Sequence, residues 1–365
     1  MTIKDLIAFF ETIAPRTYQE SYDNSGLITG NAASEITGVL VSLDCTEAVV
    51  EEAIALKCNV VVSHHPIVFS GLKTITGKTY VERTIIKSIK NDIAIYAIHT
   101  NLDNVFEGVN KAICDKLGLL NCKILSPKMN ALKKLVTFVP DSIAESLRQA
   151  LFEAGAGNIG NYDSCSYNTI GYGTFKANEN ATPFVGKKNE LHTEPETRIE
   201  VIFESVKQIG IINALRTNHP YEEPAFDIYT LDNYLQTIGA GMCGYLAEPL
   251  DEKDFLKLVK TKFNLQCIRH TQMLGQKITK VAVCGGAGSF LLGDAMAAGA
   301  QIFITSDFKY HQFFDADGRI VIADIGHFES EQFTINLIYD LLNQNFNTFA
   351  LHFTKSVTNP VKYFI

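Results

Sequence analysis

Short runs of Val, Ile, Leu and Ala, separated by amphipathic segments, recur along this chain and constrain its fold more than any other feature. The runs cover residues 36–44, 59–65, 93–100, 278–286, 301–307 and 319–327. Segments between them, such as 47–57 and 80–92, have helical periodicity, and 329–344 suggests one long helix. Near-continuous apolar strands that alternate with helices are typical of sheets buried on both faces. The sequence therefore predicts an α/β fold with mostly parallel sheets flanked by helices.

The middle of the chain has a different order of elements. Strand-like runs at 134–140, 196–204 and 226–231 alternate with two helical segments, close to a β-α-β-β-α-β pattern. The stretch 154–190 is rich in Gly, Asn and Thr, and we expect it to form a long excursion outside the core. We therefore expect an inserted ferredoxin-like α+β domain.

The expected insert defines the domain organisation. It covers residues 128–236, and the residues on either side, 1–127 and 237–365, form one discontinuous α/β core. A chain of 365 residues is long enough for more than one hydrophobic core, which agrees with this division.

Charge and cysteine usage exclude several classes of function. The net charge is −8, so nucleic-acid binding is disfavoured because no basic face is available to neutralise phosphates. The N-terminal segment 1–15 carries Lys4, Asp5 and Glu11, unlike a signal peptide, and no run approaches the ~18 apolar residues of a membrane span. The eight cysteines form no C-x-x-C pair. We expect reduced thiols and a cytoplasmic location.

Two adjacent histidines, His64 and His65, directly follow an apolar run and give the strongest local signal. Ligand sites of open α/β sheets lie at the carboxyl ends of their strands. Beyond the strand, at a turn stiffened by Pro66, neighbouring imidazoles can reach two different metal ions. For the pair alone, packed or surface histidines remain the alternative.

Two further strand ends carry carboxylates and imidazoles. Asp103 follows the run at 93–100, where turn formation is the alternative role, and His99 ahead of it is a candidate for orienting a ligand. His327 and Glu331 are four residues apart and share one face of a helix, for which a capped surface helix is the alternative. Glu329, between them, projects elsewhere and suits a helix N-terminus.

The combination of these residues predicts a metal site. Imidazoles and carboxylates without thiolates suit zinc, iron, manganese or cobalt in an open, reactive site. Five ligands exceed the number that one catalytic zinc uses, so a carboxylate that bridges two ions is the economical interpretation. We therefore expect two divalent transition-metal ions, bound by His64, His65, Asp103, His327 and Glu331.

A glycine-rich turn at 284–290 is a weaker candidate. It follows an apolar run and precedes a helical segment, so the N–H groups of Gly285, Gly286 and Ser289 could hold an anion. The turn lacks the lysine of a phosphate-binding loop, and a tight turn is the simpler explanation.

Two other clusters have equally plausible structural roles. Lys309, Tyr310 and His311 follow the run at 301–307 and could bind substrate or shuttle protons; packing or surface exposure explains them as well. The segment 219–229 gathers a histidine, two glutamates and two tyrosines around prolines that also suit a turn.

Several ordered motifs together resemble a known family. They are YDNSGLITG (22–30), SHHPIVF (63–69), HTNLDN (99–104), GYLAEPL (244–250), CGGAGSF (284–290), TSDFKYH (305–311) and DIGHFESE (324–331). On these residues the chain resembles, over almost its whole length, the NIF-three-like dinuclear metal-centre family, also called GTP cyclohydrolase 1 type 2 homologues. One departure is Tyr22, where the family usually has tryptophan; it leaves the metal ligands untouched.

The resemblance implies more than the residues do by themselves. It implies a two-metal cluster at the five ligands named above, an inserted domain similar to PII and CutA proteins, and a ring-like homohexamer built of dimers or trimers. It also implies hydrolytic chemistry on a small nucleotide or other phosphate-bearing substrate, with GTP suggested by the family name. The alternative is a non-enzymatic metal-handling or regulatory protein, in which the insert is a sensor or interaction module.

Overall fold

A computed structural model describes residues 1–364, which form a mixed α/β fold with several sheets. The chain divides into two compact units, one made of Met1–Pro127 and the segment from Gln236 onward, the other of Lys128–Leu235. The second unit thus ends one residue before the boundary expected at 236. Within residues 1–364, no helix has the length and apolar character needed to cross a membrane.

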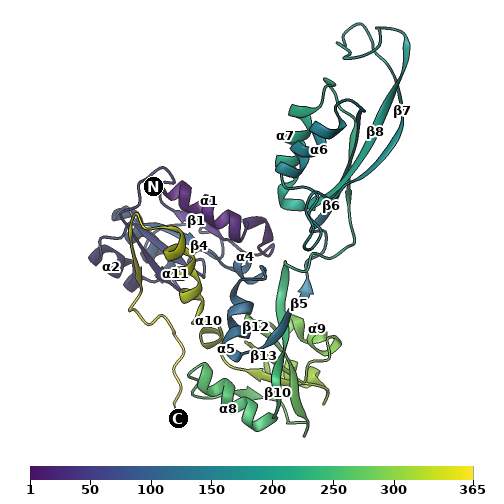
Figure 1. Ribbon diagram of the computed structural model, residues 1–365. Coiled ribbons are helices and arrows are strands. Elements are labelled where there is room, and N and C mark those ends of the chain that lie inside the picture. The colour runs from purple at the N-terminus through teal and green to yellow at the C-terminus, as the bar shows by residue number, and fades with distance from the viewer. Residues whose placement is uncertain (365) are drawn as a thin grey trace. The chain divides into compact units, whose positions relative to one another are not determined.

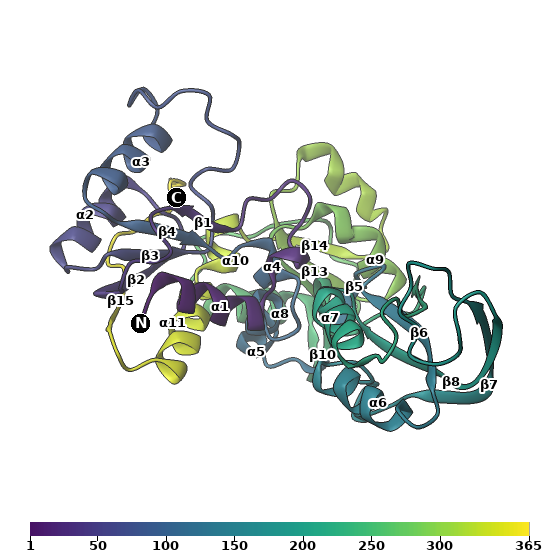
Figure 2. The same cartoon turned by 90° about the horizontal axis from the view of Figure 1, so that it is seen from above.

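The first sheet of the first unit has five strands in the order β1-β4-β3-β2-β15. Figure 1 labels β1 and β4 of this sheet, and Figure 2 labels all five strands. They are β1 (Gly26–Thr29), β2 (Gly38–Ser42), β3 (Val60–Ser63), β4 (Ala94–Ala97) and β15 (Ala350–Phe353). Strands β15, β2, β3 and β4 are parallel neighbours, and β1 pairs antiparallel with β4. Every residue of β2, β3 and β4 is buried, as expected for a sheet covered on both faces.

Helices cover both faces of this sheet, as Figure 2 shows. On one face lie α2 (Glu47–Ala55) and α3 (Tyr80–Lys90), and on the other lie α1 (Ile3–Ile13) and α11 (Thr334–Asn345). Helix α1 begins at a capping box in which Thr2 and Asp5 satisfy each other's backbone N–H groups. Its Phe10 stacks on Tyr96 of β4, with ring centroids 5.2 Å apart. The 3-10 helix η1 (Arg16–Tyr18) follows α1.

The second sheet of the first unit has six strands in the order β11-β14-β13-β12-β10-β5. They are β5 (Leu120–Pro127), β10 (Gly239–Asp251), β11 (Arg269–His270), β12 (Lys277–Ala287), β13 (Ile302–Ser306) and β14 (Val321–Asp324). Only β12, β13 and β14 are parallel to one another. The expectation of a mostly parallel sheet is therefore wrong here. Strand β5 leads into the insert and β10 returns from it, and the two strands pair antiparallel. Antiparallel neighbours can be joined at the same end of the sheet, without the crossover connection that parallel strands require.

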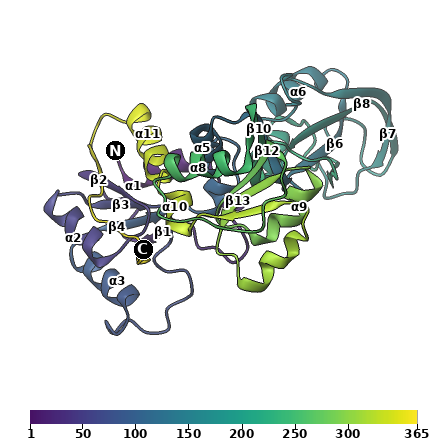
Figure 3. The same ribbon diagram turned by 90° about the horizontal axis from the view of Figure 1, so that it is seen from below.

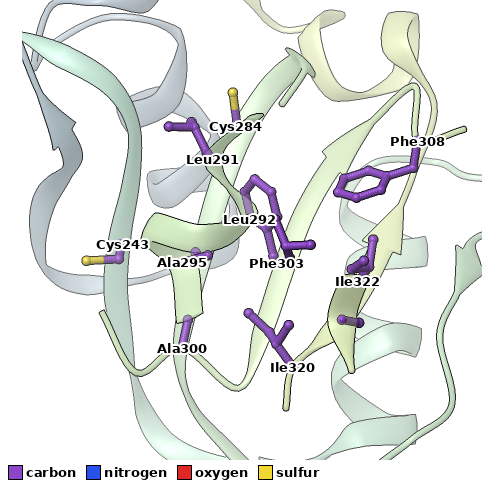
Figure 4. Packing of buried hydrophobic residues seen from close by; sticks show 12 residues of the cluster. Cys243, Cys284, Leu291, Leu292, Ala295, Ala300, Phe303, Phe308, Ile320 and Ile322 are labelled. Atoms are coloured by element: carbon purple, nitrogen blue, oxygen red, sulfur yellow. The ribbon is translucent and has the colours of Figure 1, made fainter. Parts of the chain in front are cut away.

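The core of the second sheet is packed between helices (Figure 3). Helices α5 (Val109–Leu117) and α8 (Glu252–Lys262) lie on one face and α9 (Leu292–Ala297) on the other. Figure 4 shows Leu292 and Ala295 beside Phe303, with Ile322 on the neighbouring strand, and all four residues are nearly or fully buried. Two 3-10 helices, η3 (Ser289–Leu291) and η4 (Tyr310–Ala316), complete this side.

The segment after β14 forms two helices in place of the one expected at 329–344. Helix α10 (His327–Glu331) ends before α11 begins. Between them, Gln332 donates a side-chain hydrogen bond to the carbonyl of Phe263, and the Phe333 ring packs against that of Phe263. These tertiary contacts break the helix, although the helical periodicity continues through the break.

The second unit has the order β-α-β-β-α-β. Its elements are β6 (Leu132–Pro140), α6 (Ala144–Glu153), β7 (Tyr167–Lys176), β8 (Leu191–Glu204), η2 (Ser205–Lys207), α7 (Gln208–Asn218) and β9 (Phe226–Thr230). The strand order is β7-β8-β6-β9, with antiparallel neighbours. The stretch 154–190, expected to be an excursion, thus contributes edge strand β7. Its sequence hides the strand because β7 is largely exposed and contains Gly171 and Gly173.

Candidate metal centre

Three strand ends of the first unit bring the predicted ligands together. His64 and His65 follow β3, and their N–H groups extend the ladder by donating to the carbonyls of Ser42 and Leu43. Asp103 ends the single-turn helix α4 (Thr100–Asp103), which follows β4. His327 and Glu331 are the first and last residues of α10, one turn apart on the same face.

Glu331 lies between the other four side chains. Its Oε2 is 2.9 Å from Nε2 of His65 and 3.2 Å from Nε2 of His327. Its Oε1 is 3.9 Å from Nε2 of His64, which in turn is 3.6 Å from Oδ1 of Asp103. The donor atoms thus form two groups that share Glu331, and within each group they lie within 4.8 Å of one another. Both groups have a composition and spacing that could hold a metal ion.

His99 completes a third group with His64 and His65. Its ring lies edge-on to both of these imidazoles, with centroids 5.3 Å away. We expected His99 to orient a ligand from behind, but it lies among the donor atoms and is itself oriented by Asp23.

Each of the four imidazoles has its Nδ1 within hydrogen-bond distance of a fixed oxygen. The acceptors are the Ile98 carbonyl for His64 (2.8 Å), Asp44 for His65 (2.7 Å), Asp23 for His99 (2.7 Å) and Asp307 for His327 (2.6 Å). An imidazole that donates from Nδ1 has its Nε2 available as a ligand, and such outer partners also fix the ring orientation. All four rings are therefore prepared to bind through Nε2.

The three outer carboxylates were not among the residues predicted from the sequence. Asp44 follows β2 and Asp307 follows β13, so their position at strand ends was an available signal. Asp23 lies in the loop before β1, where only the tertiary structure brings it to His99. Asp44 is itself held by Thr358, whose hydroxyl donates to its Oδ2 at 2.6 Å.

Two buried polar atoms of the centre have no hydrogen-bond partner among the described residues. They are Nε2 of His64 and Oδ1 of Asp103. A buried polar atom left unpaired costs about 1–3 kcal/mol, so such atoms are rare without a reason. Here a nitrogen lone pair and a carboxylate oxygen face each other at 3.6 Å. This donor set fits a metal ion, which would satisfy both atoms at once.

Burial and neighbouring charges shift the pKa values of the two carboxylates, Asp103 and Glu331, in opposite directions. Burial raises the pKa of Asp103 to about 7, and the negative charge of Glu331 adds to this effect. Burial opposes the ionised form of Glu331 too, but hydrogen bonds with His327 and His65, together with the nearby His64 imidazole, hold its pKa well below the usual range.

The pKa values of the imidazoles beside Glu331 are raised, whereas that of Glu331 is lowered. Burial by itself lowers the pKa of His65, but hydrogen bonds to Asp44 and Glu331 outweigh it and raise the pKa to about 9. The same balance, with Asp307 as the outer partner, raises the pKa of His327 to about 11. Without metal, protonated imidazoles thus provide the positive charge that Glu331 requires.

The glycine turn makes room for Glu331, and two of its N–H groups are not free to hold an anion. The N–H of Gly285 donates to Asn110 at 3.0 Å, and that of Gly286 donates to the Ser330 hydroxyl at 2.9 Å. Both N–H groups are therefore occupied. Gly286 has φ +62°, and a Cβ there would lie 2.4 Å from Oε1 of Glu331. The Ser289 hydroxyl accepts a hydrogen bond from Gln312.

Lys309, Tyr310 and His311 point to the surface rather than into the centre. All three are exposed at the start of η4, where the Tyr310 ring packs edge-on against His311. None of them lines the cavity at the metal centre. Their proposed part in substrate binding or proton transfer is thus unsupported in this chain. Glu329 turns away as expected, and its Oε1 accepts a hydrogen bond from Asn359.

A cavity of about 740 Å³ opens onto the centre. His65, His99, Asp103, His327 and Glu331 contribute to its wall. The aromatic residues that line it are Tyr22, Phe69, Tyr80 and Phe290, together with the imidazoles. Among the described residues that form its lining there is no lysine or arginine. The cavity therefore combines acidic groups and aromatic rings, a setting that suits cations and flat heterocycles.

Known proteins resemble this chain over most or all of its length. A protein of Halalkalibacterium halodurans named GTP cyclohydrolase 1 type 2 homolog is 41% identical over 325 residues, covering 88% of this chain and 87% of that protein. A protein of the same name from Staphylococcus epidermidis is 33% identical over the full length of both chains. The crystal structure of a Bacillus cereus protein related to NIF3 superposes with a TM-score of 0.86 at 36% identity, covering 100% and 99% of the two chains. Residues 1–360 match the model of one family, and with these full-length relatives the match shows that the chain belongs to Duf34/NIF3 (NGG1p interacting factor 3).

Proposed function

We propose that the centre binds two divalent transition-metal ions. His64, Asp103 and Glu331 would hold one ion, and His65, His327 and Glu331 the other. The observation that carries this proposal is the position of Glu331, whose two oxygens face the two different donor groups. Zinc, iron, manganese and cobalt all suit imidazole and carboxylate ligands.

We infer that the protein is a metal-dependent hydrolase of the GTP cyclohydrolase 1 type 2 kind, the activity in the names of its relatives. Paired ions supply an acidified water and polarise a substrate oxygen. The chain's own contribution is to orient the donors and to handle protons. His99 is the candidate for proton transfer, because Asp23 fixes its Nδ1 and its ring lies at the cavity wall.

The cavity lining favours a compact substrate that contains a heterocycle. Aromatic residues such as Tyr22 and Phe290 offer faces on which a flat ring can stack. Because the lining contains no lysine or arginine in the described residues, phosphate groups would depend on the ions for neutralisation. A small nucleotide with GTP as its first candidate remains the proposed substrate class, and long polyanions are disfavoured.

Elemental analysis and turnover assays test this proposal together. Protein purified without chelator should contain about two equivalents of metal. We would incubate it with GTP and with a generic phosphoester, using Asp103→Ala as the control variant. Turnover that disappears in the variant supports a hydrolase. Equal background rates in both proteins, across metals and substrates, would favour the alternative of a metal-handling or regulatory protein.

We also propose that the second unit is a PII/CutA-like module with its own stability. Its β-α-β-β-α-β order and its strand order support this assignment. Gly239 pairs with Pro127 across β10 and β5, so a short turn could replace the whole insert. The shortened protein should stay folded and bind metal. Loss of the fold would mean that the insert is integral to the core.

Assembly and location complete the proposal. A ring-like homohexamer would bury the exposed apolar side chains of the β7–β8 hairpin, among them Ile170 (77% exposed), Tyr172 (77%) and Leu191 (75%). Light scattering coupled to size-exclusion chromatography measures the mass directly, and a monomer at micromolar concentration would contradict the hexamer.

All eight cysteines are free thiols, which supports a cytoplasmic location.

A further inference from the structure

A second cavity, of about 590 Å³, lies in the inserted unit. Helices α6 and α7 cover one face of its sheet (Figure 1), where Ile199 and Val201 of β8 are buried in the core. Side chains alternate along a strand, so Glu196 and Arg198 point to the opposite face. Both line this cavity, which shares no residue with the metal centre.

A buried carboxylate forms part of the cavity wall. Glu196 is only 8% exposed, and its Oε1 accepts a hydrogen bond from the Tyr221 hydroxyl at 2.8 Å. In the described part of the chain no hydrogen-bond donor is paired with its Oε2. Burial and the charge of Glu196 raise the pKa of Tyr221, so that hydroxyl remains a donor. Glu196 lines the cavity, so a ligand there that donates a hydrogen bond to Oε2 would pair this oxygen.

Aromatic rings surround the same space. The rings of Phe175 and Phe184 pack around that of Tyr221, with centroid distances of 6.0 and 6.3 Å. All three side chains line the cavity, together with Phe138. Aromatic faces attract cations, and a carboxylate beside several rings is the chemistry of sites that bind ammonium groups.

The remaining charges of the lining are also acidic. Glu222 and Glu223 lie at the cavity, and Glu222 accepts the N–H of Thr182 at 2.9 Å. The single cation of the lining, Arg198, is paired with Glu200 at 2.8 Å. The cavity therefore presents a net negative charge and no unpaired cation among its described residues.

Glycines on β7 keep the space above Glu196 open. Gly171 is the cross-strand partner of Glu196, and a Cβ there would meet nothing within 4 Å. Gly173 has the opposite constraint, because a Cβ there would lie 2.1 Å from Oε2 of Glu196. Glycine normally weakens a strand; here Gly173 leaves room for the Glu196 carboxylate, and Gly171 leaves open space beside it.

We propose that this cavity binds a small organic ammonium compound, such as an aliphatic amine or a methylated ammonium. An ammonium N–H, or the positive charge of a methylated nitrogen, lies against Oε2 of Glu196. The carbon atoms pack on the rings of Phe175, Phe184 and Tyr221. The site would make the insert a sensor of such compounds, a function separate from chemistry at the metal centre.

Calorimetric titration of the full-length, metal-replete protein tests the proposal. The probes are spermidine and choline, with citrate and inorganic phosphate as anions of similar size. We expect one of the two ammonium compounds to bind once per chain, more weakly at high salt, and neither anion to bind in the insert. Absence of binding by both ammonium compounds at millimolar concentration would overturn the proposal, as would anion binding that the insert variants abolish.

Variants locate the binding. Glu196→Gln keeps the shape and the Tyr221 hydrogen bond but removes the charge, so affinity should fall at least tenfold. Gly171→Val places a branched side chain in the open space, where a Cβ meets nothing within 4 Å, and should abolish binding while the melting temperature is retained. Glu153→Gln, on α6 at the other face of the sheet, is the matched charge control and should bind like the parent. Unchanged affinity in both cavity variants would show that any ammonium binds elsewhere.

Discussion

The two halves of the metal centre differ in how they satisfy their polar atoms. The inner half, His64 with Asp103, is the more buried, with side-chain exposures of 0% and 20%. The outer half, His65 with His327, is exposed to 20% and 40%. In the inner half Nε2 of His64 and Oδ1 of Asp103 lack partners, whereas both outer imidazoles already contact Glu331.

This difference shows what each half does in the absence of metal. The outer half can hold protons in place of an ion, because its imidazoles have carboxylate partners on both ring nitrogens. The inner half has no such substitute, since Nδ1 of His64 donates to the carbonyl of Ile98. We therefore predict a tightly held inner ion and an outer ion that exchanges readily.

The largest expected effect is that of Glu331→Gln, which removes the charge shared by both halves. Metal content should fall from about two equivalents to nearly none, because Glu331 is the ligand that the two ions share and both would lose it. Elemental analysis after gel filtration measures this, with circular dichroism to check the fold. Glu329→Gln, on the same helix but hydrogen-bonded to Asn359, is the control and should keep both ions. Full metal content in Glu331→Gln would contradict a bridging role.

Single-ligand variants separate the halves. His327→Ala should retain about one ion, the inner one, and that ion should resist a chelator such as EDTA for longer than the ion retained by His64→Ala. The reason is that the inner site is shielded from solvent and has fewer competing protons. Release is followed with a chromogenic chelator. Equal release rates in the two variants would remove the distinction between the halves.

Gly286→Ala tests whether room for Glu331 limits metal binding. The new Cβ would approach Oε1 of Glu331, and the left-handed backbone adds about 1–2 kcal/mol of strain. We expect weaker binding of both ions. Gly318→Ala carries the same kind of strain, at φ +63°, but meets nothing within 4 Å, so it should keep its metal. Similar losses in both variants would assign the effect to strain alone.

The carboxylates that orient His65 and His327 should affect only the binding of the outer ion. Asp44→Asn and Asp307→Asn remove the negative charge of the partners that orient His65 and His327, and changes to such partners typically cost 10–100-fold in metal affinity. The inner ion should be unaffected because a backbone carbonyl orients His64. Competition titrations with a chelator give both affinities, and an equal loss at the two sites would break the comparison.

The smallest effect is a difference in pH dependence. An ion must displace the protons that its ligands carry. His65 and His327, with pKa values raised to about 9 and 11, are protonated at neutral pH, so outer-site affinity should rise as pH increases from 7 to 9. Asp103, with a pKa raised to about 7, loses its proton by pH 8, so inner-site affinity should rise up to that pH and then level off. Parallel pH profiles would contradict this account.

Particular residues show why part of the centre could be predicted from sequence. His64, His65 and Asp103 follow apolar strands, and His327 and Glu331 have helical spacing, so local pattern was enough to nominate them. Asp23 and Thr358 gave no local signal, because their role depends on a contact with a residue far away in the chain. The sequence could not tell whether the N–H groups of the glycine turn are free, because their partners, Asn110 and Ser330, come from other elements.

The sequence by itself determined the α/β character, the inserted unit and the five residues that converge at the strand ends. Periodicity and strand-end position are local properties, and they survive folding unchanged. Only the tertiary structure decided the antiparallel half of the second sheet, the break before α11, the presence of edge strand β7, and the inequality of the two halves of the centre. Pairing direction, helix breaks and burial depend on which distant segments become neighbours, and those contacts are not encoded in any single segment.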